Sequence, residues 1–220
     1  MQVQIRTSFG RTARLIRNDR AFIKATKRMP RPVTWDWAKP RLMPLIAGPR
    51  NDMPGEGLVR ASADVGCAIE FGIDIGGHFP LVDQSVAERW ETPIGELVAT
   101  SMANLARRAG AIPTAAVHDA VRSGRIIRIL RQPVGCASSV LLVPDELKRL
   151  FGGHDQVFGA PGRHTLVSFP TEMPTATVAD LHVEMEMEEL MPLFLLPFAM
   201  DDGRLLWADT NLDDEDLLED

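Results

Sequence analysis

Three adjacent side chains, Arg163, His164 and Thr165, are the part of this sequence best suited to bind or transform a small anion. An arginine guanidinium forms paired hydrogen bonds with carboxylates and phosphates, and a histidine changes charge near neutral pH. His154 and Asp155 lie across a predicted hairpin from them. The five positions predict one convergent polar patch, in which Arg163, His164 and Thr165 are the candidate anion-binding residues.

The residues before this patch do not form a phosphate-binding loop of the Walker type. Such a loop needs a glycine, four residues and then Gly-Lys-Ser/Thr, between a strand and a helix. Here Gly162 precedes Arg163 and a strand-like run. Proline presets φ at the first central position of a type II turn, and glycine accepts the positive φ of the second. Pro161 and Gly162 therefore predict a type II turn between strands at 156–160 and 163–169.

Other sequence patterns do not define a catalytic centre. Cys67 and Cys136 are far apart, stand in apolar surroundings and lack a metal or redox spacing, so we expect two buried, reduced thiols. The chain has no tyrosine and no Gly-x-Ser-x-Gly elbow. The glutamates of 184–189 are expected to form a solvated face. Catalytic residues are therefore left unassigned.

A polar cluster at Asp74, His78 and Asp83 could be drawn as a metal or acid/base site. A half-buried strand at 67–75 followed by a hairpin turn at 76–77 explains the same residues as alternating strand positions. A transition-metal site needs three converging ligands in a recognisable spacing. We therefore predict neither a metal nor a cofactor.

The composition is that of a soluble globular protein, with 220 residues of which 45% are hydrophobic and 25% charged. The most apolar run, 190–200, is short and contains two prolines, so it predicts no membrane span. No apolar block or small-residue cleavage site follows the basic N-terminus, which argues against a secretory signal and leaves an organelle transit peptide as the alternative. We expect a cytoplasmic protein.

Charge is distributed unevenly along the chain. Residues 1–50 carry twelve Lys and Arg against two acids, a net charge of +10, whereas residues 51–220 have a net charge of −16. A basic helix is predicted over 11–28, and its candidate residues for binding an acidic protein surface are Arg14, Arg17 and Arg20. Basic segments also bind phosphates, but aromatic residues are not interleaved with these arginines as a single-strand stacking surface requires. Nucleic-acid binding is therefore the alternative.

Hydrophobic periodicity predicts an α+β fold, in which a mostly antiparallel sheet is covered by helices. The sheet is expected to contain hairpins at 67–82 and 156–169, a strand at 125–131 and a terminal hairpin around 201–203. The covering helices are predicted at 92–109, 144–151 and 178–191. An apolar face is expected on the last of these helices, formed by Ala179, Val183, Met187, Leu190 and Met191.

The chain divides into three predicted parts. Residues 1–57 comprise the basic helix and a Pro-rich connector, which Trp35 and Trp37 pin to the body. Residues 58–209 form a single α+β domain. Residues 210–220 form an acidic tail, since such blocks of like charge are usually solvated.

Several segments, taken in order, resemble a bacterial protein family. They are a strand pair, a tryptophan-led helix that ends near Asn-Leu, an Ala-Ser segment with leucines, and a Pro-x-Arg turn. The matching residues are Trp90, Asn104, Leu105, Ala137, Ser138, Leu141, Leu142, Pro161 and Arg163. Over about residues 60–170 the chain is similar to the family catalogued as domain of unknown function 1444, although His164 stands where that family has aspartate. The resemblance implies a compact intracellular α+β domain of bacterial origin, without an established activity.

These observations favour a non-catalytic binding or accessory protein, which contacts a protein partner through its basic N-terminal helix or its acidic tail. One alternative is an enzyme that acts on an anionic small molecule near Arg163 and His164. A second alternative is nucleic-acid binding through the basic N-terminal segment.

Overall fold

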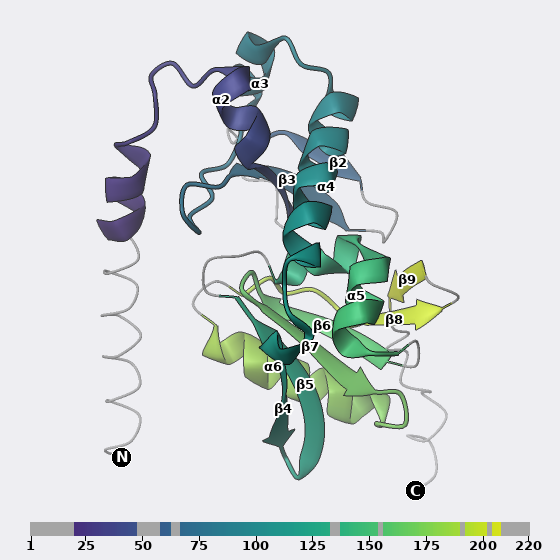
Figure 1. Ribbon diagram of the computed structural model, residues 1–220. Helices are drawn as coiled ribbons and strands as arrows, with labels where there is room; N and C mark the ends of the chain where they lie inside the picture. Colours follow the sequence, from purple (N-terminus) through teal and green to yellow (C-terminus); the bar gives the residue numbers. More distant parts are fainter. Residues whose placement is uncertain are drawn as a thin grey trace, which may run out of the picture.

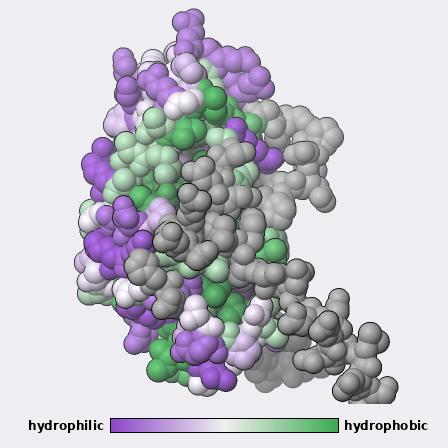
Figure 2. All heavy atoms as spheres, turned by 90° about the vertical axis from the view of Figure 1, so that its right-hand side faces the viewer, coloured by the Kyte–Doolittle hydropathy of each residue, from purple (hydrophilic) through white to green (hydrophobic). Residues whose placement is uncertain are grey.

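The computed structural model confirms the α+β fold, in which helices cover antiparallel sheet (Figure 1). The prediction of one sheet is wrong, because the segments at 67–82 and 156–169 belong to two separate sheets. The residues that it describes are 20–47, 58–62, 67–132, 137–153, 156–189, 192–201 and 204–207. Within these ranges, no helix has both the length and the apolar character needed to cross a membrane. Figure 2 shows polar side chains spread over one face of the molecule, with smaller apolar areas between them.

The smaller sheet has three strands in the order β1-β3-β2. They are β1 (Leu42–Ala47), β2 (Arg60–Ser62) and β3 (Ala68–Ile73). The helical elements in this part of the chain are α2 (Trp35–Ala38), η1 (Lys39–Arg41), α3 (Gln84–Trp90) and α4 (Ile94–Gly110). Helix α4 lies along β1. Asn104 Nδ2 of α4 donates to the carbonyl oxygens of Lys39 in η1 (2.8 Å) and of Leu42 in β1 (2.9 Å).

The larger sheet has six strands in the order β4-β5-β7-β6-β8-β9. They are β4 (Val117–Arg122), β5 (Arg125–Arg131), β6 (Gln156–Gly162), β7 (Thr165–Pro170), β8 (Phe198–Asp201) and β9 (Arg204–Trp207). The other elements are η2 (Thr114–Ala116), η3 (Ser138–Leu142), α5 (Pro144–Phe151) and α6 (Thr175–Glu188). Helix α6 covers one face of this sheet, while α5 and η3 lie on the other (Figure 1).

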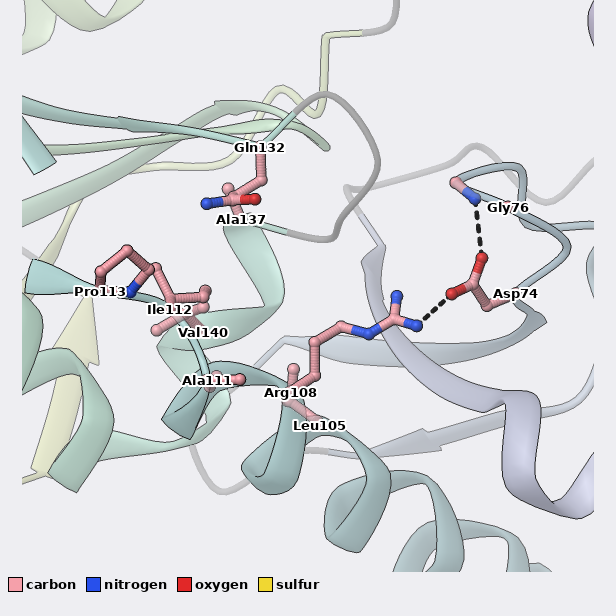
Figure 3. A pocket seen from close by; sticks show the side chains of 12 residues that line it. Asp74, Gly76, Leu105, Arg108, Ala111, Ile112, Pro113, Gln132, Ala137 and Val140 are labelled. Atoms are coloured by element: carbon pink, nitrogen blue, oxygen red, sulfur yellow. Dashed lines mark hydrogen bonds and ion pairs between the residues drawn. The ribbon is translucent and has the colours of Figure 1, made fainter. Parts of the chain in front are cut away.

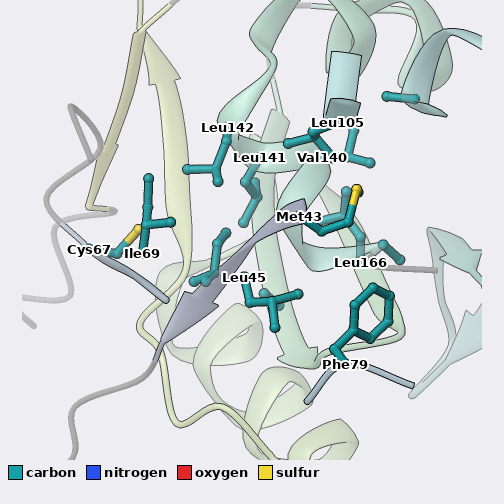
Figure 4. Close-up of a cluster of buried hydrophobic side chains, with 14 of the residues drawn as sticks. Met43, Leu45, Cys67, Ile69, Phe79, Leu105, Val140, Leu141, Leu142 and Leu166 are labelled. Carbon is teal, nitrogen blue, oxygen red and sulfur yellow. The ribbon is translucent and has the colours of Figure 1, made fainter. Parts of the chain in front are cut away.

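Two hydrophobic clusters follow from this layering. The larger one joins both sheets, because Met43 and Leu45 of β1 pack with Leu141 of η3 and Leu166 of β7 (Figure 4). The smaller one lies between the larger sheet and α6, and its buried members are Ile127, Ile129, Val167, Phe169, Met173, Val178, Leu181 and Met185. Helix α6 is therefore anchored by a core of its own.

The prediction of a connector over 30–57 is wrong for its central part. Residues 42–47 form β1, whose six residues are all buried, and they pair with β3. The strand was not predicted from the sequence because Pro44, which has no N–H to donate, is unfavourable in most strands. The proline is tolerated because β1 is an edge strand, where one N–H side is not needed by a neighbour. Trp35 does pin this segment to the body, packing on Trp90 with ring centroids 5.4 Å apart.

Strand β3 was expected to be half-buried, and this prediction is also wrong. Its residues from Ile69 to Ile73 are buried on both faces, including the carboxylate of Glu70, which is 3.2 Å from the Arg60 guanidinium. The hairpin after it is confirmed, since Ile73 N–H donates to the carbonyl of Pro80. The terminal hairpin is confirmed as well, by the pairing of β8 with β9.

The type II turn at Pro161 and Gly162 is wrong. Both residues belong to β6, and the chain reverses instead at Arg163 and His164, so that Gly162 pairs with Thr165. Gly162 does not have the positive φ of a type II turn. It is needed for space, because a Cβ atom there would lie 2.7 Å from the Glu189 side chain.

The predicted helices agree closely with α4, α5 and α6. Helix α5 begins at Pro144 and ends at Phe151, and Gly152 caps it in the left-handed conformation with a φ of 75°. Of the predicted basic N-terminal helix, residues 20–26 are described and helical, with Arg20 exposed. Arg14, Arg17 and the acidic tail at 210–220 lie outside the described residues.

Candidate functional site

The patch predicted at 163–165 is structured by contacts within the protein. Arg163 and His164 are half-buried in the β6–β7 turn, and the Arg163 carbonyl accepts from Ser138 Oγ at 3.1 Å. Thr165 is buried, and its Oγ1 donates to Glu189 Oε1 at 2.6 Å. These bonds hold the turn against η3 and the end of α6. His154 and Asp155 lie outside the described residues, so the anion site stays a prediction.

The polar cluster at 74–83 is also explained by local bonds. Asp74 forms an ion pair with Arg108 and accepts from the N–H of Gly77. Asp83 caps α3 by accepting from the N–H of Val86 at 2.8 Å, and its hydrogen bond from Ser85 lowers its pKa. In the part of the chain that the structure describes, no group of three or more His, Cys, Asp or Glu could hold a metal ion.

Three pockets formed by the described residues are possible ligand sites. The first, about 410 Å³ in volume, lies between the turn at 74–77, the C-terminal end of α4 and η3 (Figure 3). Its two charged side chains, Asp74 and Arg108, neutralise one another. The second, about 600 Å³, lies beside α3 and the start of α4. Among the described residues that line these two pockets, no buried side-chain nitrogen or oxygen lacks a hydrogen-bond partner.

The third pocket, which we call the α6 pocket, differs in this respect. It has a volume of about 410 Å³ and lies between α6 and the segment that leads into β8. Its walls are mainly apolar, and its floor includes two buried ionisable side chains. The residues that line it are Thr175, Ala176, Ala179, Asp180, His182, Val183, Glu186, Phe194, Leu195, Leu196 and Pro197.

The helical spacing of α6 explains why a histidine and a glutamate are buried here. Val178, Leu181 and Met185 recur at intervals of three and four residues and face the sheet. His182 and Glu186 flank this stripe, and only 3% and 6% of their surfaces are exposed. They are one helical turn apart and therefore lie side by side.

Strand β6 provides the space that His182 occupies. A Cβ atom at Gly159 would lie 2.4 Å from His182 Cδ2 and 3.0 Å from Val167 Cγ1. Real side chains do not tolerate the shorter of these distances, so only glycine lets the imidazole approach the strand. Gly159 is thus a positioning residue for this pocket.

The apolar face predicted for this helix is exposed. Val183 and Met187 are 55% and 65% exposed, so this face is not the one that packs on the sheet. Helix α6 carries apolar residues on two sides, and the sheet covers only the side with Val178 and Leu181. Phe194 and Leu196 are also exposed beside the pocket, which surrounds its mouth with apolar surface.

Burial changes the charge behaviour of both side chains on the pocket floor. It lowers the pKa of the His182 imidazole from 6.5 to about 4, so the ring is neutral at pH 7. It raises the pKa of the Glu186 carboxyl, an effect opposed by hydrogen bonds from the backbone N–H groups of Phe194 and Leu195. His182 Nδ1 lies 3.9 Å from Glu186 Oε1, which is beyond hydrogen-bond distance.

The two side chains keep unused hydrogen-bonding atoms. His182 Nε2 and Glu186 Oε1 are buried without a hydrogen-bond partner. Such atoms are rare in folded proteins and unfavourable, because burial removes their hydration without replacing it. Phe194 adds local strain, since its φ is 53°, a value rare for residues other than glycine. Strained backbone that directs N–H groups at a buried carboxylate is typical of binding sites.

Sequence reasoning missed this site because it assigned the glutamates of 184–189 to a solvated face. That prediction is wrong for Glu186. The signal that could have found it is the pairing of His182 and Glu186 at a four-residue interval, next to a stripe formed by Val178, Leu181 and Met185. The second apolar stripe, through Val183, masked the first.

Comparisons with protein-family models, with curated proteins and with solved structures return no match for this chain. The candidate site therefore has to be judged on its own geometry and chemistry.

Proposed function

We propose that this chain is a non-catalytic binding protein and that the α6 pocket is its ligand site. The observation that carries the proposal is that two buried ionisable side chains, His182 and Glu186, line an apolar cavity of about 410 Å³ and that Glu186 Oε1 has no hydrogen-bond partner. Small-molecule sites are typically apolar cavities of roughly 300–1,000 Å³ with a few convergent polar groups. The α6 pocket matches this description in volume, walls and floor.

The chemistry of His182 favours a hydrogen-bonding role over that of a general base. A general base works best when its pKa is near the working pH, and burial lowers the pKa of His182 to about 4. Such an imidazole is neutral at pH 7, with one ring nitrogen that donates a hydrogen bond and one that accepts. It has little capacity to remove a proton from a substrate and hold it.

The other functions considered from sequence stay predictions. Binding of a protein partner or of nucleic acid to the basic N-terminal segment would involve mainly residues before 20, which lie outside the described ranges. An enzyme acting near Arg163 and His164 lacks support from the three pockets described above, because none is lined by those residues. The cytoplasmic location expected from the sequence also stays a prediction.

The proposal is tested by screening a library of small, fragment-sized compounds against the full chain, with ligand-observed NMR as the readout. Ala179→Trp places an indole in the α6 pocket, because Ala179 lines it. Ala106→Trp is the matched control, since Ala106 is exposed on α4 and lines none of the three pockets.

We expect compounds that bind the native chain and the Ala106→Trp variant but lose binding to the Ala179→Trp variant. A library without any binder, or binders that are indifferent to Ala179→Trp, would refute the proposal. Circular dichroism on both variants verifies that the helices are retained.

A further inference from the structure

We propose that the α6 pocket selects a primary amine with a short apolar body, whose ammonium group pairs with Glu186. This inference rests on the proposed function, since it names the chemical class of the ligand. It follows from three properties of the pocket: an unused acceptor on its floor, the sign of its charges, and the character of its walls.

The floor of the pocket needs a hydrogen-bond donor. Glu186 Oε1 is buried and has no hydrogen-bond partner. His182 Nδ1 lies 3.9 Å from this oxygen. One ammonium nitrogen can reach two acceptors at that separation with normal hydrogen-bond distances, and it has three N–H groups to donate. A neutral imidazole can accept one of them, so both floor residues can serve a single ammonium group.

The charges that line the pocket favour a cation. Asp180 and Glu186 are its acidic members, His182 is neutral at pH 7, and no Lys or Arg is among the lining residues. Arg122 pairs with two other glutamates of α6, Glu188 at 2.9 Å and Glu184 at 3.6 Å, and neither glutamate lines the pocket. An anion would therefore meet a carboxylate without a compensating charge, whereas an ammonium group would neutralise one.

The walls suit an apolar body attached to that head. Ala176, Ala179 and Val183 form the α6 side, and Leu195 and Pro197 form the opposite side. Phe194 stands exposed at the mouth, where its ring can lie over an apolar or aromatic ligand. Burying such a body in this cavity removes apolar surface from water on both partners.

The experiment uses three probes that differ only in the head group: 4-phenylbutylamine, 4-phenylbutanol and 4-phenylbutyrate. Their dissociation constants are measured by NMR titration of the full chain at pH 7. We expect the amine to bind at least tenfold more tightly than the alcohol, and the butyrate to bind more weakly than either. Glu186→Gln removes the charge with little change in size, and it should reduce this preference to less than threefold.

The control variant is Glu172→Gln, which removes one carboxylate charge from an exposed turn outside the pocket. It should keep the tenfold preference. A chain that binds amine and alcohol equally, or a Glu186→Gln variant that keeps the preference, would overturn the amine assignment while leaving the pocket as a ligand site. If none of the three probes binds, the amine assignment is again refuted; the proposed function then falls with it only if the library also gives no compound sensitive to Ala179→Trp.

Discussion

Replacing His182 with glutamine should remove a specific part of the acid sensitivity of this fold. The unfolded chain binds a proton on this imidazole below about pH 6.5, whereas burial in the folded protein lowers its pKa to about 4. Between these values the unfolded state holds more protons, so its free energy falls relative to the folded state. The stability that His182 supports is complete above pH 6.5 and is lost as the pH falls towards 4.

The size of this effect follows from the two pKa values. Each pH unit over which one proton is bound only by the unfolded state corresponds to about 1.4 kcal/mol. From pH 6.5 to 4 the loss is therefore about 3 kcal/mol, a large share of the 5–15 kcal/mol typical of a folded domain. Solvent screening reduces this free energy little, because only 3% of the His182 surface is exposed.

Glu186 acts in the opposite direction. Burial raises its pKa, so the protonated carboxyl is favoured by folding, and this contribution is lost as the pH rises through the raised pKa. Comparing the native chain with His182→Gln at each pH leaves the Glu186 contribution common to both. Repeating the comparison with Glu186→Gln in both chains removes the interaction between the two side chains.

The assay is urea unfolding at a series of pH values from 7.5 to about 4. The free energy of unfolding of the native chain, minus that of His182→Gln, should fall by about 3 kcal/mol over this range. His118→Gln, which changes an exposed histidine of β4, should show no comparable fall. A difference that stays constant with pH in the His182→Gln comparison would refute the assignment of this imidazole as buried and neutral.

Three further outcomes are expected. Gly159→Ala places a Cβ 2.4 Å from His182, so it should lower the free energy of unfolding by about 1–3 kcal/mol. The control Gly95→Ala, whose Cβ would have no atom within 4 Å, should leave the free energy of unfolding unchanged or raise it slightly. Equal effects of the two variants in thermal unfolding would contradict the close approach of His182 to Gly159. Asn104→Ala deletes two hydrogen bonds to backbone carbonyls and should cost about 2 kcal/mol in urea unfolding; a neutral result would show that the link between α4 and β1 is not needed. Burial raises the pKa of Cys67 to about 11. In the variant Cys136→Ser, the folded protein should therefore resist alkylation by iodoacetamide at pH 8. Rapid labelling of Cys67 would contradict its burial.

Local sequence signals predicted the helices of this fold better than its strands. Helix α5 is delimited by Pro144 and Gly152, residues whose backbone preferences act within one turn. Strand β1 escaped prediction because Pro44 is normally unfavourable in a sheet. Its presence depends on a tertiary fact, the edge position beside β3, which no local pattern contains.

The candidate site could be predicted only in part for a similar reason. A helix was expected over 178–191 and is found at Thr175–Glu188, but the choice of buried face depends on which side meets the sheet. Both Val183 and Leu181 belong to plausible apolar stripes, so periodicity alone gives two answers. The burial of His182 further depends on Gly159, which is 23 positions earlier in the chain and meets it only after β6 and α6 pack together.

The central claim is that a ligand binds in the α6 pocket. A ¹⁵N–¹H correlation spectrum of the full chain, recorded during titration with 4-phenylbutylamine, tests that claim directly. We expect the largest amide shifts within 175–187 and 193–198, on the two walls of the α6 pocket. Shifts centred instead on Arg108 and the turn at 74–77, or the absence of any localised shift, would contradict it.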